Sequence, residues 1–375
     1  VNASKAAFYL SQVGSTSVDL LSSYPKAPKT DDVSTFLKEG SVSLFSWYDA
    51  SAGNIDMLEQ NLEYAHTALQ EIPAWLPGTS GSIGKLRTLT TTATTTLPKT
   101  RALFETLRED LYNTAYLVVF QNDGELRPSG GFIGSYALIQ ASKGAVDSFT
   151  FGRNIYKFDK GFEGAAKLTP PLLFREPAYY WSFRDSNVRG GFRDPIAADV
   201  MRMFQLATLT PTSGVIFVDT SVLESLLELT GPISTPALGE AITAENVSTV
   251  LQQHVEKSYF ATPENRIENE PKSILGDLIP ILLDKVSTTP NLLEKVLPEL
   301  SKAIERKSIQ FSFANPVLNE QVGNFLPIDS PIQGGNWLKI VNSNLMGGKS
   351  SRYVAQDVRV ERTASLIGNH KYHVT

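Results

Sequence analysis

The sequence predicts an α/β protein with a helical region before it and a β-rich extension after it. Over residues 1–111, apolar residues recur at three-and-four spacing, which is typical of amphipathic helices. From residue 112 to residue 315, short apolar runs alternate with helical stretches, as in a layered α/β domain. Residues 316–375 return to an alternating pattern, which predicts a small appended sheet.

The helical region is expected to form a hairpin or bundle, because its helices are amphipathic and their breaks are short. Threonine is a mediocre helix former, but the threonine-rich stretch Lys85–Leu97 keeps helical spacing. Its threonines are expected to line a solvated helix face. The predicted helices are 1–24, one that opens at Asp32, 55–72, and 85–111 with a break near Pro98.

The α/β region starts at the stretch Tyr116–Ile139, in which two apolar runs flank a polar bend. The turn Ser142–Lys143–Gly144 is typical of a hairpin, and Asp194 with Pro195 is typical of a helix start. The predicted strands are 116–120, 133–140, 145–151, 214–218 and 309–313. The predicted helices are 195–207, 221–229, 243–256, 274–286 and 292–307. In the β-rich extension we expect strands at 337–342, 353–362 and 371–375.

Composition excludes several classes of protein. A net charge of −5 and a pI of about 5.6 argue against a nucleic-acid partner. The absence of cysteine removes thiolate catalysis and Cys-based zinc sites. The chain contains no P-loop, no GxSxG elbow, no HExxH pair and no GxGxxG fingerprint, so a conventional hydrolase or nucleotide enzyme is not expected. No apolar run approaches the roughly 20 residues that span a bilayer.

Arginines in loops are the main candidates for function. A guanidinium group suits phosphate and pyrophosphate, because its planar fork binds two oxygens and its charge stabilises charge on phosphorus. The alternative is that each arginine ties a loop or lies on the surface, and that the glycine pair after Arg127 only forms a turn. The candidates are Arg127 in ELRPSGG, Arg153 at a strand end, Arg184 beside Asp185 in WSFRDSN, and Arg266 and Lys272 in PENRIENEPK.

Aromatic residues crowd the same loops. They can line a groove for a lipid or sugar, or they can form a core beneath a long loop, which is the more common outcome. They are Phe174, Tyr179, Tyr180, Trp181, Phe183 and Phe192.

Two stretches resemble a known family. QNDGELRPSGGFIGSYALIQASKGAVDSF and GVIFVDTSVLESLLELTGPI, with ITAENV after the latter, are similar to the bacterial domain of unknown function 4012 over roughly Leu111–Arg362. That family is in turn similar to the LytR-CpsA-Psr proteins. These are membrane-anchored extracytoplasmic enzymes that move glycopolymers from a polyprenyl-pyrophosphate carrier to peptidoglycan. The resemblance implies an α/β/α sandwich with arginines around the pyrophosphate, a carboxylate-bound divalent metal such as Mg²⁺, and an apolar groove for the prenyl tail.

The resemblance also implies roles for particular residues. Arg153 matches an Arg-Asp pair at a strand end, but Asn154 follows it here. Gly134–Ser135 stands where the family has a Ser-Asp pair, so two metal-binding carboxylates are missing, and Asp185 or Asp194 is the available substitute. Arg266 and Lys272 are a looser match to a later pair of arginines.

The functional expectation is therefore an extracytoplasmic envelope protein that binds, or also transfers, a polyprenyl-(pyro)phosphate-linked glycopolymer. The site would use Arg153 and Asp185 for catalysis, and Arg127, Arg184, Arg266 and Lys272 for the ligand. Membrane attachment would come through an N-terminal anchor outside this sequence. The alternative is a non-catalytic envelope scaffold or adhesion protein that kept the fold without the chemistry.

Overall fold

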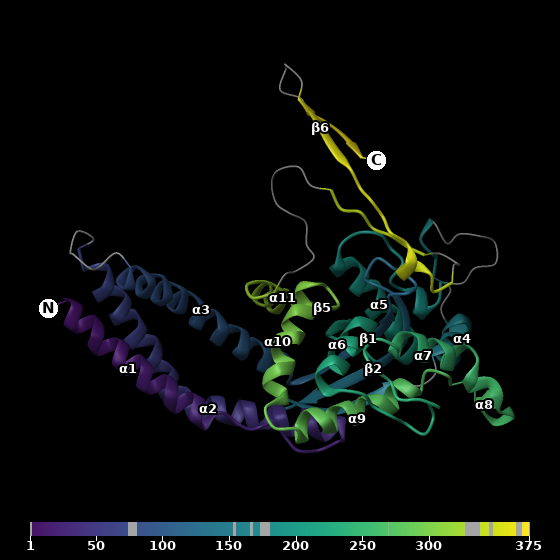
Figure 1. The fold of residues 1–375 in the computed structure, drawn as a ribbon, viewed down its shortest axis with the longest axis horizontal. Helices are drawn as coiled ribbons and strands as arrows, with labels where there is room; N and C mark the ends of the chain where they lie inside the picture. Colours follow the sequence, from purple (N-terminus) through teal and green to yellow (C-terminus); the bar gives the residue numbers. More distant parts are fainter. Residues whose placement is uncertain are drawn as a thin grey trace.

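The computed structural model describes residues 2–73, 81–152, 155–165, 168–172, 181–268, 270–326, 338–344, 348–364 and 370–374. It confirms an α/β fold with helices before the sheet. Figure 1 shows a long helical arm that leads to a body built around one sheet, with a hairpin that extends from the body near the C-terminus. None of the helices in the described ranges is long and apolar enough to cross a membrane.

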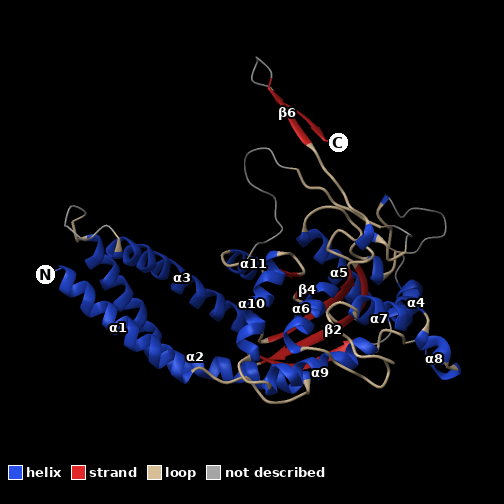
Figure 2. Cartoon of the chain, viewed as in Figure 1, coloured by secondary structure: helices blue, strands red, loops and turns tan. Residues whose placement is uncertain are grey.

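A five-stranded mixed sheet forms the centre of the body, in the order β3-β2-β1-β4-β5 (Figure 2). The central strand β1 pairs parallel with β4 and antiparallel with β2. All five strands lie where the sequence predicts them, because each is a run of apolar residues bounded by turn residues. Their bounds are β1 Asn113–Asn122, β2 Phe132–Ser142, β3 Ala145–Gly152, β4 Gly214–Asp219 and β5 Ile309–Phe313.

Both faces of the sheet are covered, so the body has three layers. Leu117 and Val119 on β1 and Phe217 on β4 face α5 (Arg193–Thr208), and they share one core with its residue Phe204. Ile216 and the other alternate residues of β4 and β5 face α6 (Thr220–Thr230) and α10 (Leu292–Glu305). This alternation follows from the two-residue period of a strand, which places neighbouring side chains on opposite faces.

The arm consists of α1 (Asn2–Ser23), α2 (Val33–Gln70) and α3 (Ser82–Asp110). Two predicted breaks are wrong. The helix that opens at Asp32 and the helix predicted at 55–72 form one continuous helix, α2. They continue into each other because α2 packs along α1 and the glycine between them, Gly53, costs only about 1 kcal/mol. Pro98 lies inside α3, on its exposed side, where water can bind the carbonyl group that the proline leaves unpaired.

The N-terminal end of α2 covers β3, an edge strand of the sheet. The hydroxyl of Ser34 accepts a hydrogen bond from the amide of Phe149 at 2.9 Å and donates one to its carbonyl at 3.0 Å. The hydroxyl of Ser41, two turns further along α2, accepts one from the amide of Val146 at 3.0 Å. These serines satisfy backbone groups of the edge strand β3 that would otherwise be open to pairing with another chain.

The other helices of the body differ from the prediction mainly at their ends. Helix α5 begins at Arg193, so Asp194 lies in its first turn instead of capping it. The sequence analysis does not predict the short helices α4, α8 and α11, which have 11, 6 and 8 residues. The bounds are α4 Ile155–Ala165, α7 Val247–Glu256, α8 Pro263–Glu268, α9 Ile274–Thr288 and α11 Pro316–Gly323.

The β-rich extension is smaller than predicted. Its strands are β6 (Val360–Ala364) and β7 (His370–Val374), which pair only with each other. Residues 338–342 and 354–359 form no strand, because no described neighbouring strand pairs with them, and Tyr353 ends a 3-10 turn, Ser351–Tyr353. Residues 338–344 and 348–353, which we call the strap, lie against the loop between β1 and β2.

Replacing Ser34 with alanine should lower the free energy of unfolding by about 1–2 kcal/mol, because it leaves a backbone amide and carbonyl of β3 without partners. Chemical denaturation measures the change. The matched control is Ser46→Ala on the exposed side of α2, which should change it by less than about 0.5 kcal/mol. Equal effects of the two substitutions would contradict the role given to Ser34.

Candidate functional site

The candidate site lies at the edge of the sheet where the parallel strands β1 and β4 end. In α/β proteins this edge is the usual place for ligands. The loop from β1 to β2 crosses the edge and bends at Gly130 and Gly131. Gly130 has a φ of 129°, and a Cβ atom on Gly131 would lie 2.3 Å from the carbonyl oxygen of Asn122. The glycine pair is therefore required by the bend itself.

Polar side chains join this bend to the turn at residues 183–187. The amide group of Asn187 donates to the Ser129 hydroxyl at 2.7 Å and to the Gly131 carbonyl at 2.8 Å. Gln121 at the end of β1 donates to the same two oxygens. These side chains are buried, so each hydrogen bond replaces water that cannot reach them.

Arg127 makes the second connection, and it is almost fully paired. Its Nη2 lies 3.0 Å from Glu125 Oε1 and 3.1 Å from Asp185 Oδ1, while its Nη1 donates to the carbonyls of Leu126 and Asn344. The side chain is 3% exposed, and only Nε is without a partner. In this arrangement Arg127 holds the loop and orients Asp185, whose side chain is 2% exposed.

Arg184, the next arginine, is more open. Its Nη1 lies 3.1 Å from Asp159 Oδ2 on α4, and its guanidinium carbon lies 5.6 Å from the centre of the Tyr156 ring. Asp159 also accepts a hydrogen bond from the Phe183 amide at 2.8 Å. Burial raises the pKa of Asp159 to about 6, although the Arg184 guanidinium and the Phe183 amide oppose that shift.

Lys272 lies just before α9 and reaches the same place. Its Nζ lies 4.9 Å from the centre of the Phe132 ring and 5.2 Å from the centre of the Tyr156 ring. It also lies 3.3 Å from the position that a Cβ atom on Gly134 would occupy. Gly134 sits in a bulge of β2, opposite the irregularity between Phe120 and Gln121. The structure thus brings Arg127, Arg184, Lys272 and Asp185 into one cluster.

The strap covers the outer side of this cluster. The Asn344 amide donates to the Leu126 carbonyl at 2.9 Å, and the Ser351 amide donates to the Gly124 carbonyl at 3.0 Å. The strap also brings Lys349, whose Nζ lies 3.0 Å from Glu256 on α7. The cluster is therefore built from five parts of the chain: the β1–β2 loop, α4, the turn at 183–187, the start of α9 and the strap.

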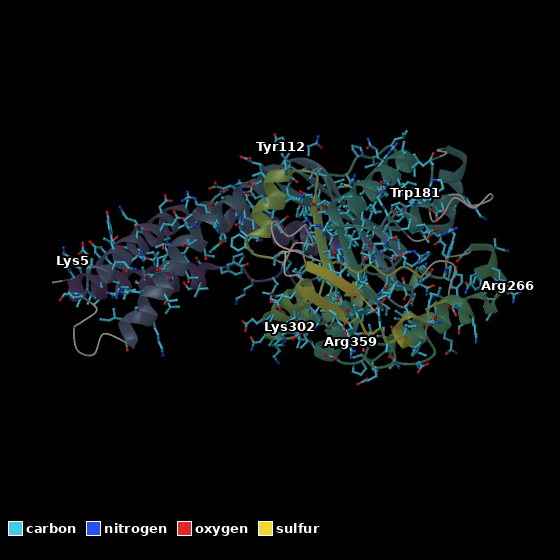
Figure 3. The ribbon with its side chains drawn as sticks, turned by 90° about the horizontal axis from the view of Figure 1, so that it is seen from above. Lys5, Tyr112, Trp181, Arg266, Lys302 and Arg359 are labelled. Carbon is cyan, nitrogen blue, oxygen red and sulfur yellow. The ribbon has the colours of Figure 1, made fainter. Side chains whose placement is uncertain are left out.

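Two of the sequence candidates are not placed in this cluster. Arg153 lies outside the described residues. Arg266 is exposed on α8, where its Nε donates to the Phe260 carbonyl at 2.7 Å, and no described ion pair joins it to the cluster. Figure 3 shows Arg266 at one end of the molecule, apart from Trp181, whose indole donates to the Asp185 carbonyl at 2.8 Å.

The described aromatics of these loops form a core. Trp181 and Phe183 are buried with Tyr136, Phe158 and Phe204 against the sheet. Phe192 carries the Lys339 ammonium over its ring at 4.6 Å. Phe174, Tyr179 and Tyr180 lie outside the described residues.

Sequence reasoning missed Asp159, Tyr156 and Lys349. Asp159 carried one usable signal, since it stands beside Phe158 in the short stretch IYKFD, where a carboxylate next to apolar residues suggests a buried acid. Lys349 offered no signal, because only the path of the strap brings it to the site. The described part of the chain holds no group of three or more His, Asp or Glu side chains that could bind a metal ion.

The carboxylates at hand do not fit the divalent metal that the resemblance implies. Asp185 is bound by Arg127, and Asp159 is bound by Arg184. Gly134 and Ser135 add no carboxylate, and Asp194 is committed to Arg193 at 2.7 Å and to the Ser312 hydroxyl at 2.8 Å. A hard cation needs several free oxygens. We therefore derive no step through a metal.

A shallow cavity of about 360 Å³ lies at the opposite edge of the sheet, where β1 starts and β2 ends. It is lined by small polar side chains, among them Asn113, Gln140 and Ser142. It contains none of the sequence candidates. Its residues offer hydrogen bonds but no arginine or lysine for a phosphate.

Comparison with known proteins supports the resemblance in part. Residues 113–255 match the family model described as "Protein of unknown function (DUF4012)", which confirms the resemblance to domain of unknown function 4012 for that part of the chain. One similar solved structure is the crystal structure of protein gbs0355 from Streptococcus agalactiae. It is 15% identical, covers 57% of this chain and 74% of its own, and has a TM-score of 0.35. No curated protein matches the sequence.

Replacing Arg127 with methionine should lower the free energy of unfolding by about 3–5 kcal/mol, because it leaves the buried Asp185 carboxylate without its partner. Denaturant titration measures the change, and the double variant R127M/D185N should recover part of the loss. Lys38→Gln, which breaks the exposed pair with Asp147, is the control and should cost less than about 1 kcal/mol. An equally small effect of Arg127→Met would show that the ion pair between Arg127 and Asp185 does not stabilise the fold.

Ionisation of Asp159 should lower the free energy of unfolding as the pH rises from about 4 to about 6. The folded protein keeps the proton on this carboxyl at a pH where the unfolded chain has lost it, so ionisation favours unfolding. In Asp159→Asn this part of the slope disappears, a difference of up to about 3 kcal/mol across the interval. Thermal unfolding at a series of pH values measures it, with Asp147→Asn as the exposed control. Parallel curves for wild type and Asp159→Asn would refute the assignment.

Proposed function

We propose that this protein is an extracytoplasmic envelope protein that binds the phosphate or pyrophosphate of a polyprenyl-linked glycopolymer at the edge where β1 ends. The observation that carries the proposal is the convergence of Arg127, Arg184 and Lys272 on the rings of Phe132 and Tyr156. These cations come from three separate segments, which is unusual for a purely local loop contact. The resemblance to the glycopolymer transferases supports the same class of ligand.

The chemistry of the cluster suits an anion. Arg184 is 28% exposed. Its described ion pairs use Nη1, to Asp159 at 3.1 Å, and Nε, to Asp185 at 3.8 Å, so the N–H groups of Nη2 remain for a ligand. The apolar faces of Phe132 and Tyr156 keep water from part of the cluster, which strengthens its electrostatic interactions. A phosphate group that entered here would meet Arg184 and Lys272 directly, while Arg127 would support the loop from behind.

Transfer of the polymer is a separate expectation. The sequence offers Asp185 for positioning an acceptor hydroxyl, but its carboxylate is held by Arg127 in this arrangement. Burial raises the pKa of Asp159 to about 6, which suits a group that exchanges a proton near neutral pH. We therefore propose binding as the function and leave Asp185 and Arg153 as predicted catalytic residues.

One set of observations favours the second candidate, a non-catalytic scaffold of the envelope. Two of the three guanidinium nitrogens of Arg127 are paired, Asp185 is buried, and Trp181 and Phe183 pack in a filled core instead of lining a groove. A scaffold would use this cluster to join the loops and would need no ligand.

Binding to vesicles distinguishes the two candidates. The protein should bind phosphatidylcholine vesicles that contain undecaprenyl phosphate or pyrophosphate more tightly than vesicles that contain phosphatidylglycerol. Arg184→Gln should weaken this binding about tenfold or more, because one charge-assisted contact contributes roughly 1.5–3 kcal/mol. The exposed Arg306→Gln is the control and should change nothing.

Two further variants test the remaining sequence candidates in the same assay. Arg153→Ala and Arg266→Gln should each weaken binding if these residues contact the ligand. Equal binding to both anionic vesicles, or no effect of Arg184→Gln, would exclude the binding function and favour the scaffold.

A further inference from the structure

Lys272 occupies the centre of the cluster. The centre of the Phe132 ring lies 5.5 Å from the Arg127 guanidinium carbon and 4.9 Å from Lys272 Nζ. The centre of the Tyr156 ring lies 5.6 Å from the Arg184 guanidinium carbon and 5.2 Å from Lys272 Nζ. Each ring is therefore shared by Lys272 and one arginine. Cations hold this position because the ring faces are negative, but two cations on one ring also repel each other.

Lys272 differs from the other cations of the cluster in having no acidic partner. Arg127 pairs with Glu125 and Asp185, Arg184 pairs with Asp159, and Lys349 pairs with Glu256. Within the described part of the chain, Lys272 makes no ion pair and no hydrogen bond. Lys272 is partly buried, and an ammonium group with three N–H donors loses stability when it is partly removed from water without an anion. Among the described cations of the cluster, Lys272 is therefore the one without an acidic partner.

The sheet makes room for this nitrogen. Gly134 lies in the bulge of β2, and a side chain there would meet Lys272 Nζ at 3.3 Å. Because the residue is glycine, the ammonium can approach the backbone at the edge where β1 ends. Bulges often re-aim groups beside functional sites, and here the bulge leaves the ammonium group facing the cluster.

The surroundings of Lys272 lower its pKa when no anion is bound. Burial, with Lys349 and Arg184, lowers the pKa of Lys272 to about 7. Glu125 in the β1–β2 loop and Asp159 on α4 act in the opposite direction and are too weak to restore it. Tyr156, also on α4, is neutral near this pH, because burial raises its pKa further.

We propose that this site binds its phosphate or pyrophosphate together with a proton, which Lys272 takes up to become the ammonium ion. The inference rests on the proposed function for the nature of the ligand. The anion supplies the negative charge that Lys272 lacks, so it stabilises the charged form, and by linkage the proton strengthens binding of the anion. The affinity for the ligand is thus high in neutral or acidic solution and low in alkaline solution.

Two probes separate this inference from the proposed function. A short-prenyl pyrophosphoryl-N-acetylglucosamine is a pyrophosphate diester, which does not titrate between pH 6 and pH 9, and sulfate is a dianion without a lipid or sugar. Titration calorimetry at pH 8, in buffers of different ionisation enthalpy, should show uptake of up to about one proton for each molecule bound. Between pH 7 and pH 9 the affinity should fall by up to about tenfold per pH unit.

Variants of Lys272 complete the test. Lys272→Met should bind about tenfold more weakly at pH 6, take up no proton at pH 8, and show no change in affinity between pH 7 and pH 9. It should fold, because it removes a partly buried charge that has no acidic partner among the described residues. Lys272→Arg keeps its charge at every pH, so it should bind without proton uptake. The exposed Lys302→Met is the control and should behave like the wild type.

The results of these experiments separate proton uptake by Lys272 from the polyprenyl ligand of the proposed function. Binding of sulfate with proton uptake, but no binding of the diester, would support the role of Lys272 and exclude the polyprenyl ligand. Binding of either probe without proton uptake, or unchanged proton uptake in Lys272→Met, would overturn the inference. Failure of both probes to bind would overturn the inference and the proposed function together.

Discussion

The buried ion pair between Arg127 and Asp185 is the interaction on which the arrangement of the site depends. It joins the loop after β1 to the turn at 183–187, and the Ser129–Asn187 hydrogen bond joins the same two segments a short distance away. A buried pair stabilises only when the remaining donors are also satisfied. Here Glu125 and two carbonyls satisfy most of them, so the loop has one defined position.

That position determines where the other charges lie. With the turn at 183–187 held in place, Arg184 projects over Tyr156 and meets Asp159 on α4. The strap then closes over the loop through backbone hydrogen bonds and contributes Lys349. The arginines at the core of the cluster are matched by carboxylates, and the remaining positive group is Lys272. The imbalance is local, since the chain as a whole carries a net charge of −5.

The fold was largely predictable from the sequence, and the exceptions have physical causes. The strands of the main sheet follow from continuous apolar runs, whose burial on both faces is encoded in the residues themselves. The two helices predicted from Asp32 and over 55–72 are one, and Pro98 does not break its helix, because packing of the arm and an exposed position allow both helices to continue. The segments at 338–342 and 354–359 had strand patterns, but a strand exists only where a neighbour pairs with it.

The stretch from Tyr116 to Ile139 shows what the sequence alone determined. It specified a strand, a bend that requires glycine, a second strand and an arginine between them, because these features depend on local conformation and composition. Whether that arginine is open to a ligand or already paired depended on the Asp185 carboxylate and the Asn344 carbonyl, which are 58 and 217 positions away in the chain. Only the tertiary structure could decide this. The same holds for Lys272, whose unpaired state depends on which distant carboxylates the fold gives to its neighbours.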